Sequence, residues 1–243
     1  DLIDFIGFIY QTFGFTYKVE LSTKPEKALG DKKIWDKAEK ILTKVLQAEK
    51  IDFKINPGDG AFYGPKIDFH LTDSIGRSWQ CGTIQLDFSM PEKFDLTYTD
   101  ADGKEKRPVM LHRAIYGSVE RFLGMLVEHY AGAFPTWLSP MQAVIIPVSE
   151  KFSDWGEKVL TELKSHGLRA ELDASDESLG KRIRNAEKQK MPYILVVGEK
   201  EKNDKTVAVR KRGEGDLGAE KLDKFITRIK KEIEEKNKIS LYS

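Results

Sequence analysis

The sequence predicts an α+β domain built around an antiparallel hairpin, followed by an α/β domain. Three observations predict this fold class. The 243 residues are enough for about two domains with cores of their own. Two segments in which apolar and polar residues alternate, 66–72 and 77–88, flank a short turn, which is typical of a hairpin. From about residue 141, strand-like and helical segments alternate, which is typical of an α/β domain.

The first part begins with segments that have the pattern of core elements. Residues 2–13 predict a helix that ends at Gly14, and residues 15–21 predict a strand, because apolar and polar residues alternate there. A loop punctuated by Pro25 and Gly30 follows. Asp31 then caps a long helix. Its predicted apolar stripe comprises Ile34, Trp35, Ala38, Ile41, Leu42, Val45 and Leu46.

The hairpin is predicted to have one apolar and one polar face. The polar face of its first strand carries Lys66, Asp68 and His70, and that of its second strand carries Thr83, Gln85 and Asp87. Gly82 is a candidate bulge that would let Gln80 and Thr83 point toward the same space. Trp79 and Cys81 are expected to share the face with Gln85, which suits a partly desolvated ligand floor. The alternative is an ordinary sheet whose polar face meets water.

Residues 107–126 combine an apolar strand, ending at His112 and Arg113, with a helix that starts after Gly117. The predicted apolar face of the helix comprises Val119, Phe122, Leu123, Leu126, Val127 and Tyr130. Arg121 falls in the first turns, where unpaired backbone N–H groups already favour an anion, so its guanidinium would reinforce a phosphate site. The alternative is that Glu120 and Arg121 form a solvated helix face.

A proline-bounded linker, residues 130–140, separates the first part from the second. The second part is predicted to form a mainly parallel sheet with helices. Its expected strands are 141–148, 168–172, 193–197 and 206–211, and its expected helices are 154–165, 179–189 and 221–235. The predicted domains are therefore residues 1–140 and 141–243.

Composition restricts the setting and the partners. The net charge is +1, so a polyanion must be met by local patches of charge and not by a global field. The sequence lacks an apolar run of about 20 residues, and its N-terminus does not have the pattern of a signal peptide, so we expect no membrane partner. One cysteine, Cys81, allows no internal disulfide and fits a cytoplasmic setting. The chain starts at Asp1 with an apolar helix, and we expect it to be a piece of something longer.

Residues 107–126 resemble the third signature motif of class II aminoacyl-tRNA synthetases, in which small residues lead into Glu120-Arg121 and a further apolar run. More specifically, several segments are similar to the C-terminal part of the threonyl-tRNA synthetase family, in the family's order. They are the loop 21–30, GAFYGPK at 60–66, WQCGTIQLDF at 79–88, PVMLHRA at 108–114 and FPTWLSP at 134–140. The resemblance implies part of an α+β antiparallel class II catalytic core, followed by an anticodon-binding α/β domain.

The resemblance also implies a reaction and roles for residues. Threonine would be activated by ATP with Mg²⁺ to threonyl-adenylate and then transferred to the 3′ end of tRNA(Thr). Arg121 corresponds to the arginine that holds the triphosphate. The other implied positions are Gln80, Thr83 and Ser118 near the adenylate, Tyr63 and Gln85 in the threonine pocket, Cys81 and Ala114 as its small walls, and Lys66 near phosphate or the tRNA end. Of these, Arg121, Gln80 and Thr83 are the candidate catalytic residues.

His112 corresponds to one of three ligands of the family's zinc ion, which binds the amino group and hydroxyl of threonine. A site that demands a hydroxyl rejects valine far better than an apolar pocket, which separates similar shapes by only ~1–3 kcal/mol. The other two ligands, a cysteine and a histidine, and the first two class II motifs are expected upstream of Asp1. Nothing in the family pattern makes Cys81 or His70 replace them.

In the second part the resemblance implies anticodon contacts by Arg184, Glu201 and Arg210, with Asp176 and Ser178 at neighbouring positions. The alternative for each is solvated charge.

The function favoured by the sequence is that of a threonine–tRNA ligase, expected to be a homodimer when complete. The competing hypothesis is a noncatalytic tRNA-binding fragment or paralogue that keeps the anticodon domain. A prolyl or histidyl enzyme of the same subgroup is disfavoured by His112 and by the GAFYGPK segment.

Overall fold

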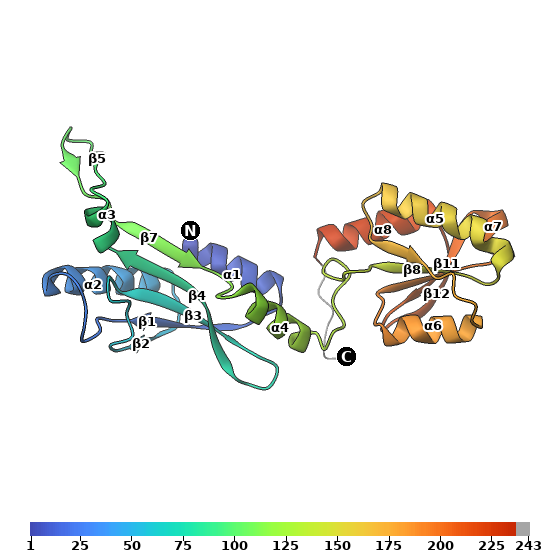
Figure 1. Ribbon diagram of the computed structural model, residues 1–243, viewed down its shortest axis with the longest axis horizontal. Helices are drawn as coiled ribbons and strands as arrows, with labels where there is room; N and C mark the ends of the chain where they lie inside the picture. Colours follow the sequence, from blue (N-terminus) through green and yellow to red (C-terminus); the bar gives the residue numbers. More distant parts are fainter. Residues whose placement is uncertain (237–243) are drawn as a thin grey trace. The chain divides into compact units, whose positions relative to one another are not determined.

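The computed structural model describes residues 1–236, which divide into two compact units (Figure 1). The first unit is Asp1–His129 and the second begins at Tyr130. Residues 130–140, which we expected to end the first domain, are grouped with the second unit by their contacts. The domain boundary at residue 140 stays a prediction.

The first unit is built on a five-stranded sheet with the order β2-β1-β3-β4-β7 (Figure 1). The strands are β1 (Tyr17–Ser22), β2 (Phe53–Asn56), β3 (Lys66–Thr72), β4 (Ser78–Asp87) and β7 (Met110–Ala114). β1 and β2 are parallel, and the other neighbours are antiparallel. The predicted hairpin is confirmed as β3 and β4. His112 lies in the middle of β7 and not at its end.

Four helices accompany this sheet: α1 (Leu2–Thr12), α2 (Lys32–Ala48), α3 (Ser89–Lys93) and α4 (Val119–His129). A small hairpin of β5 (Tyr98–Thr99) and β6 (Glu105–Lys106) projects beyond α3 (Figure 1). The cap at the start of α2 is confirmed, because the Asp31 carboxylate accepts a hydrogen bond of 3.0 Å from the backbone N–H of Lys33.

The predicted apolar faces of α2 and α4 are only partly buried. In α2, Trp35, Ala38, Leu42 and Leu46 are buried, whereas Ile34, Ile41 and Val45 are exposed. In α4, Phe122, Met125 and Leu126 are buried, whereas Val119, Leu123 and Val127 are exposed. The predicted stripes were too wide. The side of each helix that packs against its own unit is narrower than the side that carries its apolar residues.

The second unit contains a mixed sheet with the order β12-β11-β10-β8-β9. Its strands are β8 (Ala143–Pro147), β9 (Ala170–Leu172), β10 (Tyr193–Val197), β11 (Thr206–Lys211) and β12 (Gly215–Lys221). β8, β9 and β10 are parallel, as predicted, but β11 and β12 are antiparallel. The link from β10 to β11 contains only the short α7 (Glu199–Asp204), and a parallel crossover needs a dozen or more residues.

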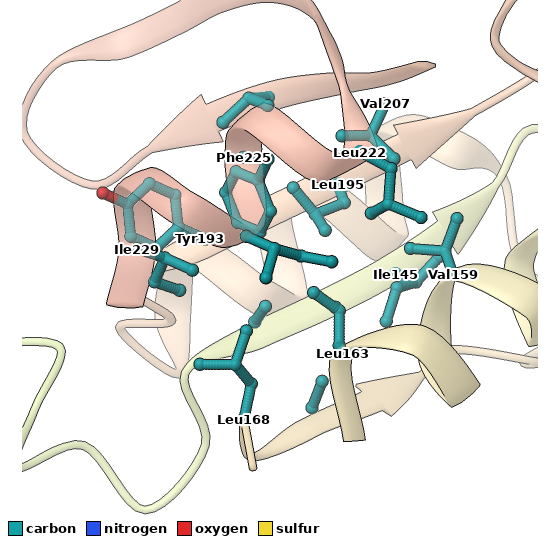
Figure 2. Packing of buried hydrophobic residues seen from close by; sticks show 14 of the residues in the cluster. Ile145, Val159, Leu163, Leu168, Tyr193, Leu195, Val207, Leu222, Phe225 and Ile229 are labelled. Atoms are coloured by element: carbon teal, nitrogen blue, oxygen red, sulfur yellow. The ribbon is translucent and has the colours of Figure 1, made fainter. Parts of the chain in front are cut away.

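The core of the second unit lies between this sheet and two helices, α5 (Ser153–Ser165) and α8 (Leu222–Glu234). Figure 2 shows Ile145 and Leu195 of the sheet facing Leu163 of α5 and Phe225 of α8. The helix α6 (Leu179–Lys188) packs through Ala186 on a second, smaller cluster. A 3₁₀ turn, η1 (Glu150–Phe152), precedes α5.

Hydrogen bonds fasten residues 131–140 to the rest of the second unit. Arg169 donates to the carbonyl oxygens of Trp137, Ser139 and Pro140 at 2.8–3.2 Å. Arg212 donates to the carbonyl oxygen of Ala133 at 3.2 Å. The predicted linker is therefore an ordered part of this unit. Within residues 1–236, none of the helices combines the length and the apolar character needed to span a bilayer.

Candidate functional site

The sheet of the first unit presents a continuous row of polar side chains across neighbouring strands. Lys66 of β3 lies opposite Gln85 of β4, and Gln85 lies opposite His112 of β7. One step along, Asp68 lies opposite Thr83, and Thr83 lies opposite Ala114. Directly opposed residues point to the same side of a sheet. We call this surface the polar face; it consists of Lys66, Asp68, Gln80, Thr83, Gln85, His112 and Ala114.

A bulge in β4 brings Gln80 onto the polar face. The register shifts between Phe69 and His70, so that Phe69 pairs with Gly82 while His70 pairs with Gln80. Gln80 then donates a hydrogen bond of 2.6 Å from Nε2 to Asp68. The predicted bulge next to Gly82, and its effect on Gln80 and Thr83, are confirmed.

The same bulge turns Cys81 away from Gln85, so the expectation that these residues share a face was wrong. Cys81 is 2% exposed, and its Sγ lies 3.8 Å from Sδ of Met125 in α4. Burial raises the pKa of the thiol, and the nearby Arg121 only partly opposes this rise. Cys81 therefore packs against α4, on the side of the sheet opposite the polar face. We had expected its side chain to form a small wall of the amino-acid pocket.

Tyr63, Gln85 and Thr83 form one hydrogen-bonded group. The Tyr63 hydroxyl donates to Oε1 of Gln85, and Nε2 of Gln85 donates to Oγ1 of Thr83 at 3.3 Å. Burial, and then the negative charge of Asp87, raise the pKa of Tyr63, so the phenol remains a donor at neutral pH. A cavity of about 600 Å³ adjoins Tyr63, with Phe88 and Arg107 among its lining residues. That volume is suited to a small ligand.

His112 is paired with a buried carboxylate. Its Nε2 lies 2.8 Å from Oδ2 of Asp87, whose side chain is 1% exposed. Burial raises the pKa of Asp87, but hydrogen bonds from the Met90 backbone, the His112 ring and the Ser89 backbone outweigh it and hold the pKa below its usual value. An ionised Asp87 orients the ring and leaves Nδ1 free to act as a ligand.

Zinc has only part of a site among these residues. No group of three or more His, Cys, Asp or Glu side chains within residues 1–236 is arranged to hold a metal ion. A protein zinc site needs three or four such ligands. The described residues therefore do not make a zinc site by themselves, although the pairing of His112 with Asp87 is the kind that orients a metal ligand.

Arg121 and Ser118 lie at the start of α4. The Ser118 hydroxyl accepts a hydrogen bond of 3.1 Å from the backbone N–H of Arg121, so Ser118 caps the helix. The exposed guanidinium of Arg121 lies 5.3 Å from the ring centroid of Trp79, a cation–π contact. The Trp79 indole donates to Asp73 at 2.9 Å. Trp79 thus supports the arginine and, like Cys81, does not join the group around Gln85.

The predicted anticodon residues of the second unit lie on three different elements. Arg184 is exposed on α6. Arg210 of β11 lies 3.5 Å from Asp216 and borders a pocket of about 200 Å³. Glu201 accepts a hydrogen bond of 2.9 Å from the backbone N–H of Gly198 and so caps α7. Nearby Arg182 is buried and donates to the carbonyl oxygen of Pro147 at 2.9 Å, which is a structural role.

Two buried carboxylates, Asp68 and Asp87, organise the site, and sequence reasoning gave neither of them a role. Both were placed on the polar face by strand periodicity. The sequence did contain a hint of their roles. Asp68 follows Lys66 by two positions and Asp87 follows Gln85 by two positions, on the same predicted face as other candidate site residues. Periodicity alone does not distinguish such carboxylates from ordinary members of a polar strand face.

The chain belongs to the class II aminoacyl-tRNA synthetases, because the "tRNA synthetase class II core domain (G, H, P, S and T)" family matches residues 1–130. The "Anticodon binding domain" family matches residues 142–232. These matches agree with the two units of the fold.

Within that class, the chain is similar to threonine–tRNA ligases. It is 54% identical over 235 residues to the threonine–tRNA ligase of Syntrophomonas wolfei and 55% identical over 235 residues to that of Clostridium novyi. Each match covers 97% of this chain and 37% of the relative, so the chain spans little more than a third of these proteins. A crystal structure described as the RNA binding domain of threonyl-tRNA synthetase from Cryptosporidium parvum superposes with a TM-score of 0.89 and 43% identity, covering 94% of this chain and 58% of that one.

Proposed function

We propose that residues 1–243 supply one side of the aminoacylation site and the anticodon-binding domain of a threonine–tRNA ligase. The observation that carries this proposal is the polar face, which gathers Gln80, Thr83, Gln85 and His112 on neighbouring strands, with Tyr63 of the loop before β3 hydrogen-bonded to Gln85. These residues come from separate segments of the sequence, and each was singled out by its similarity to the family.

In this proposal the residues have distinct tasks in forming threonyl-adenylate from threonine and ATP with Mg²⁺. Arg121 holds the triphosphate and neutralises charge that develops as pyrophosphate leaves. Gln80, Thr83 and Ser118 bind ribose or phosphate oxygens with neutral donors. Tyr63 and Gln85, already hydrogen-bonded to each other, orient threonine beside Ala114. Lys66 meets phosphate or the end of the tRNA, which is the acceptor in the second step.

His112 would supply one zinc ligand, with Asp87 fixing its ring, if the remaining ligands come from residues outside this chain. When bound, zinc would add recognition of the threonine amino and hydroxyl groups. Arg184, Glu201 and Arg210 would contact the anticodon, where splayed bases can stack on guanidinium groups. We also propose that the active protein is a cytoplasmic homodimer.

The test is threonine-dependent ATP–pyrophosphate exchange, measured on residues 1–243 and on a protein of the relatives' full length that carries them, with zinc content determined on both. We expect exchange and bound zinc only in the longer protein. Exchange by residues 1–243 alone would contradict the proposed division of the site. Binding of tRNA without exchange in either protein would favour a noncatalytic tRNA-binding role instead.

Arg121→Ala provides the matched variant in the longer protein. Loss of the triphosphate contact should cost about 2–4 kcal/mol in adenylate formation, a rate decrease of roughly 30- to 900-fold. Lys104→Ala removes an exposed cation of the same unit, outside the polar face, and should leave the rate unchanged. An unchanged rate in Arg121→Ala would remove Arg121 from the proposed site.

A further inference from the structure

The carboxylate of Asp68 is the most enclosed charged group of the polar face. Its residue is 1% exposed, and it accepts hydrogen bonds from side chains on three strands. Ser22 of β1 donates to Oδ2 at 2.6 Å, Gln80 of β4 donates to Oδ1 at 2.6 Å, and Lys66 of β3 donates to Oδ2. Two of these three donors, Lys66 and Gln80, are residues of the proposed site.

Burying a carboxylate is costly unless it is paired and hydrogen-bonded, and Asp68 meets both conditions. Its partner Lys66 is itself only 8% exposed and lies 3.3 Å from a second carboxylate, Asp59, which is largely exposed. The Lys66 ammonium is therefore held between one buried and one rim carboxylate. An ammonium has three donors, so one remains for a ligand above the sheet.

Asp68 also decides which way the Gln80 amide points. An ionised carboxylate can only accept hydrogen bonds, so Nε2 of Gln80 must face Asp68 and Oε1 must face away from it, while the second N–H of Nε2 stays available as a donor to a ligand. A side-chain amide that could flip would present a donor in one state and an acceptor in the other. With Asp68 in place, the face offers a fixed ammonium and a fixed amide to the same space.

We infer that Asp68 is a positioning residue for adenylate formation: it contacts no substrate, and it fixes Lys66 and Gln80 in the orientation that receives the phosphate and ribose groups of an adenosine nucleotide. This inference rests on the proposed function. A purely structural role would require only that Asp68 stabilise the sheet. The two roles make different predictions for kcat. If Asp68 is a positioning residue, an Asp68 variant lowers kcat only while Lys66 and Gln80 are present; if Asp68 only stabilises the sheet, the loss of kcat does not depend on them.

The experiment uses the ligase at its relatives' length and measures exchange kinetics together with thermal unfolding midpoints. Asp68→Asn keeps the shape but removes the charge that pairs with Lys66 and allows the Gln80 amide to flip. We expect kcat to fall about 10- to 100-fold, as when a group that orients an active residue is lost, with KM for threonine little changed. Asp68→Glu, which keeps the charge, should recover most of the rate.

Ser22→Ala is the matched control, because it removes a hydrogen bond from the same carboxylate while leaving Lys66 and Gln80 in contact with it. Its kcat should stay within about threefold of wild type, whatever its unfolding midpoint, since Ser22 acts on neither residue of the site. Equal losses in Ser22→Ala and Asp68→Asn would overturn the inference, because both would then reflect the sheet alone.

A second set of variants keeps the test decisive if Asp68→Asn does not fold. Combining Lys66→Met with Asp68→Asn in one protein removes both charges of the buried ion pair, so neither charge is left buried without a partner and the protein is expected to fold. In a background that carries Lys66→Met and Gln80→Ala, adding Asp68→Asn should cost less than about threefold in kcat. A further tenfold loss there would overturn the inference. Wild-type exchange is the separate check on the proposed function: no exchange in any protein defeats that function, whereas normal wild-type exchange with an unaffected Asp68→Asn defeats only the role of Asp68.

Discussion

Gly64, in the loop before β3, lies so close to β4 that any larger residue should disturb both. A Cβ atom at this position would lie 1.9 Å from the carbonyl oxygen of Leu86 and 2.8 Å from its carbonyl carbon. A carbon atom normally stays about 3.3 Å or more from a carbonyl oxygen, so the loop and β4 would have to separate by roughly 1.4 Å. The obstacle is backbone, which cannot rotate away as a side chain can.

That separation has a cost that follows from the contacts. The backbone N–H of Leu86 donates to the carbonyl oxygen of Pro65 at 3.1 Å, a bond that would be stretched beyond hydrogen-bonding range. Losing it costs about 1 kcal/mol, and overpacking a closed site costs about 1–3 kcal/mol. Gly64→Ala should therefore lower the free energy of unfolding of the first unit by about 2–4 kcal/mol.

The assay is urea unfolding combined with hydrogen exchange on peptides from β3 and β4, which follows the first unit separately from the second. Gly124→Ala is the matched control: apart from Gly124 itself, its chain neighbours and the adjacent backbone of α4, no heavy atom lies within 4 Å of the position that the alanine methyl group would occupy, and Gly124 lies in the interior of α4. Alanine there should stabilise by about 0.5–1 kcal/mol. A Gly64→Ala protein as stable as wild type would refute the steric reasoning.

Two further predictions use single ionisable groups. Because Cys81 is 2% exposed and burial raises the pKa of its thiol, Ellman's reagent at pH 8 should modify it only as fast as the first unit opens; rapid reaction of the native protein would count against this. Burial raises the pKa of Asp73, but hydrogen bonds from Trp79, Arg77 and Ile75 outweigh it and lower the pKa to about 2. Since the unfolded value is near 4, this carboxylate should contribute stability above about pH 4 that is lost as the pH falls toward 2. Acid unfolding of Asp73→Asn should lack that dependence, and an unchanged pH profile would contradict the assignment.

Much of the fold could be predicted from periodicity. The strands β10 and β11 have the predicted ends, and the other predicted helices and strands differ from the structure by a few residues. The features that were not predicted, which include the seven-residue β12, have separate causes. Short elements such as α3, β2 and the β5–β6 hairpin contain too few residues to show a helical or strand periodicity in the sequence. The direction of β11 depends on the length of the connection from β10, and that connection contains α7, which was not expected.

The composition of the site was less predictable than its location. Family similarity indicated Gln80, Thr83, Gln85 and His112 without information about their partners. Asp68 and Asp87 gain their importance from burial and from cross-strand neighbours, and a single sequence specifies neither. Conversely, Val119 and Leu123 have the apolar character of core residues, yet they are exposed in this chain. Hydrophobicity alone does not indicate which surface covers a residue.

The bulge at Cys81 and Gly82 connects the fold to the site. Side chains along a regular strand alternate, so Gln80 and Thr83, three residues apart, would point to opposite faces. One extra residue reverses that parity, which brings Gln80 to Asp68 and sends Cys81 toward Met125. The bulge must sit beside a glycine: a Cβ on residue 82 would lie 2.4 Å from the hydroxyl oxygen of Tyr10, which donates to the carbonyl oxygen of Ile115 at 2.6 Å. Tyr10 thereby links α1, the bulge and the turn that leads to Arg121, so the shape of one backbone irregularity determines which residues the polar face can contain.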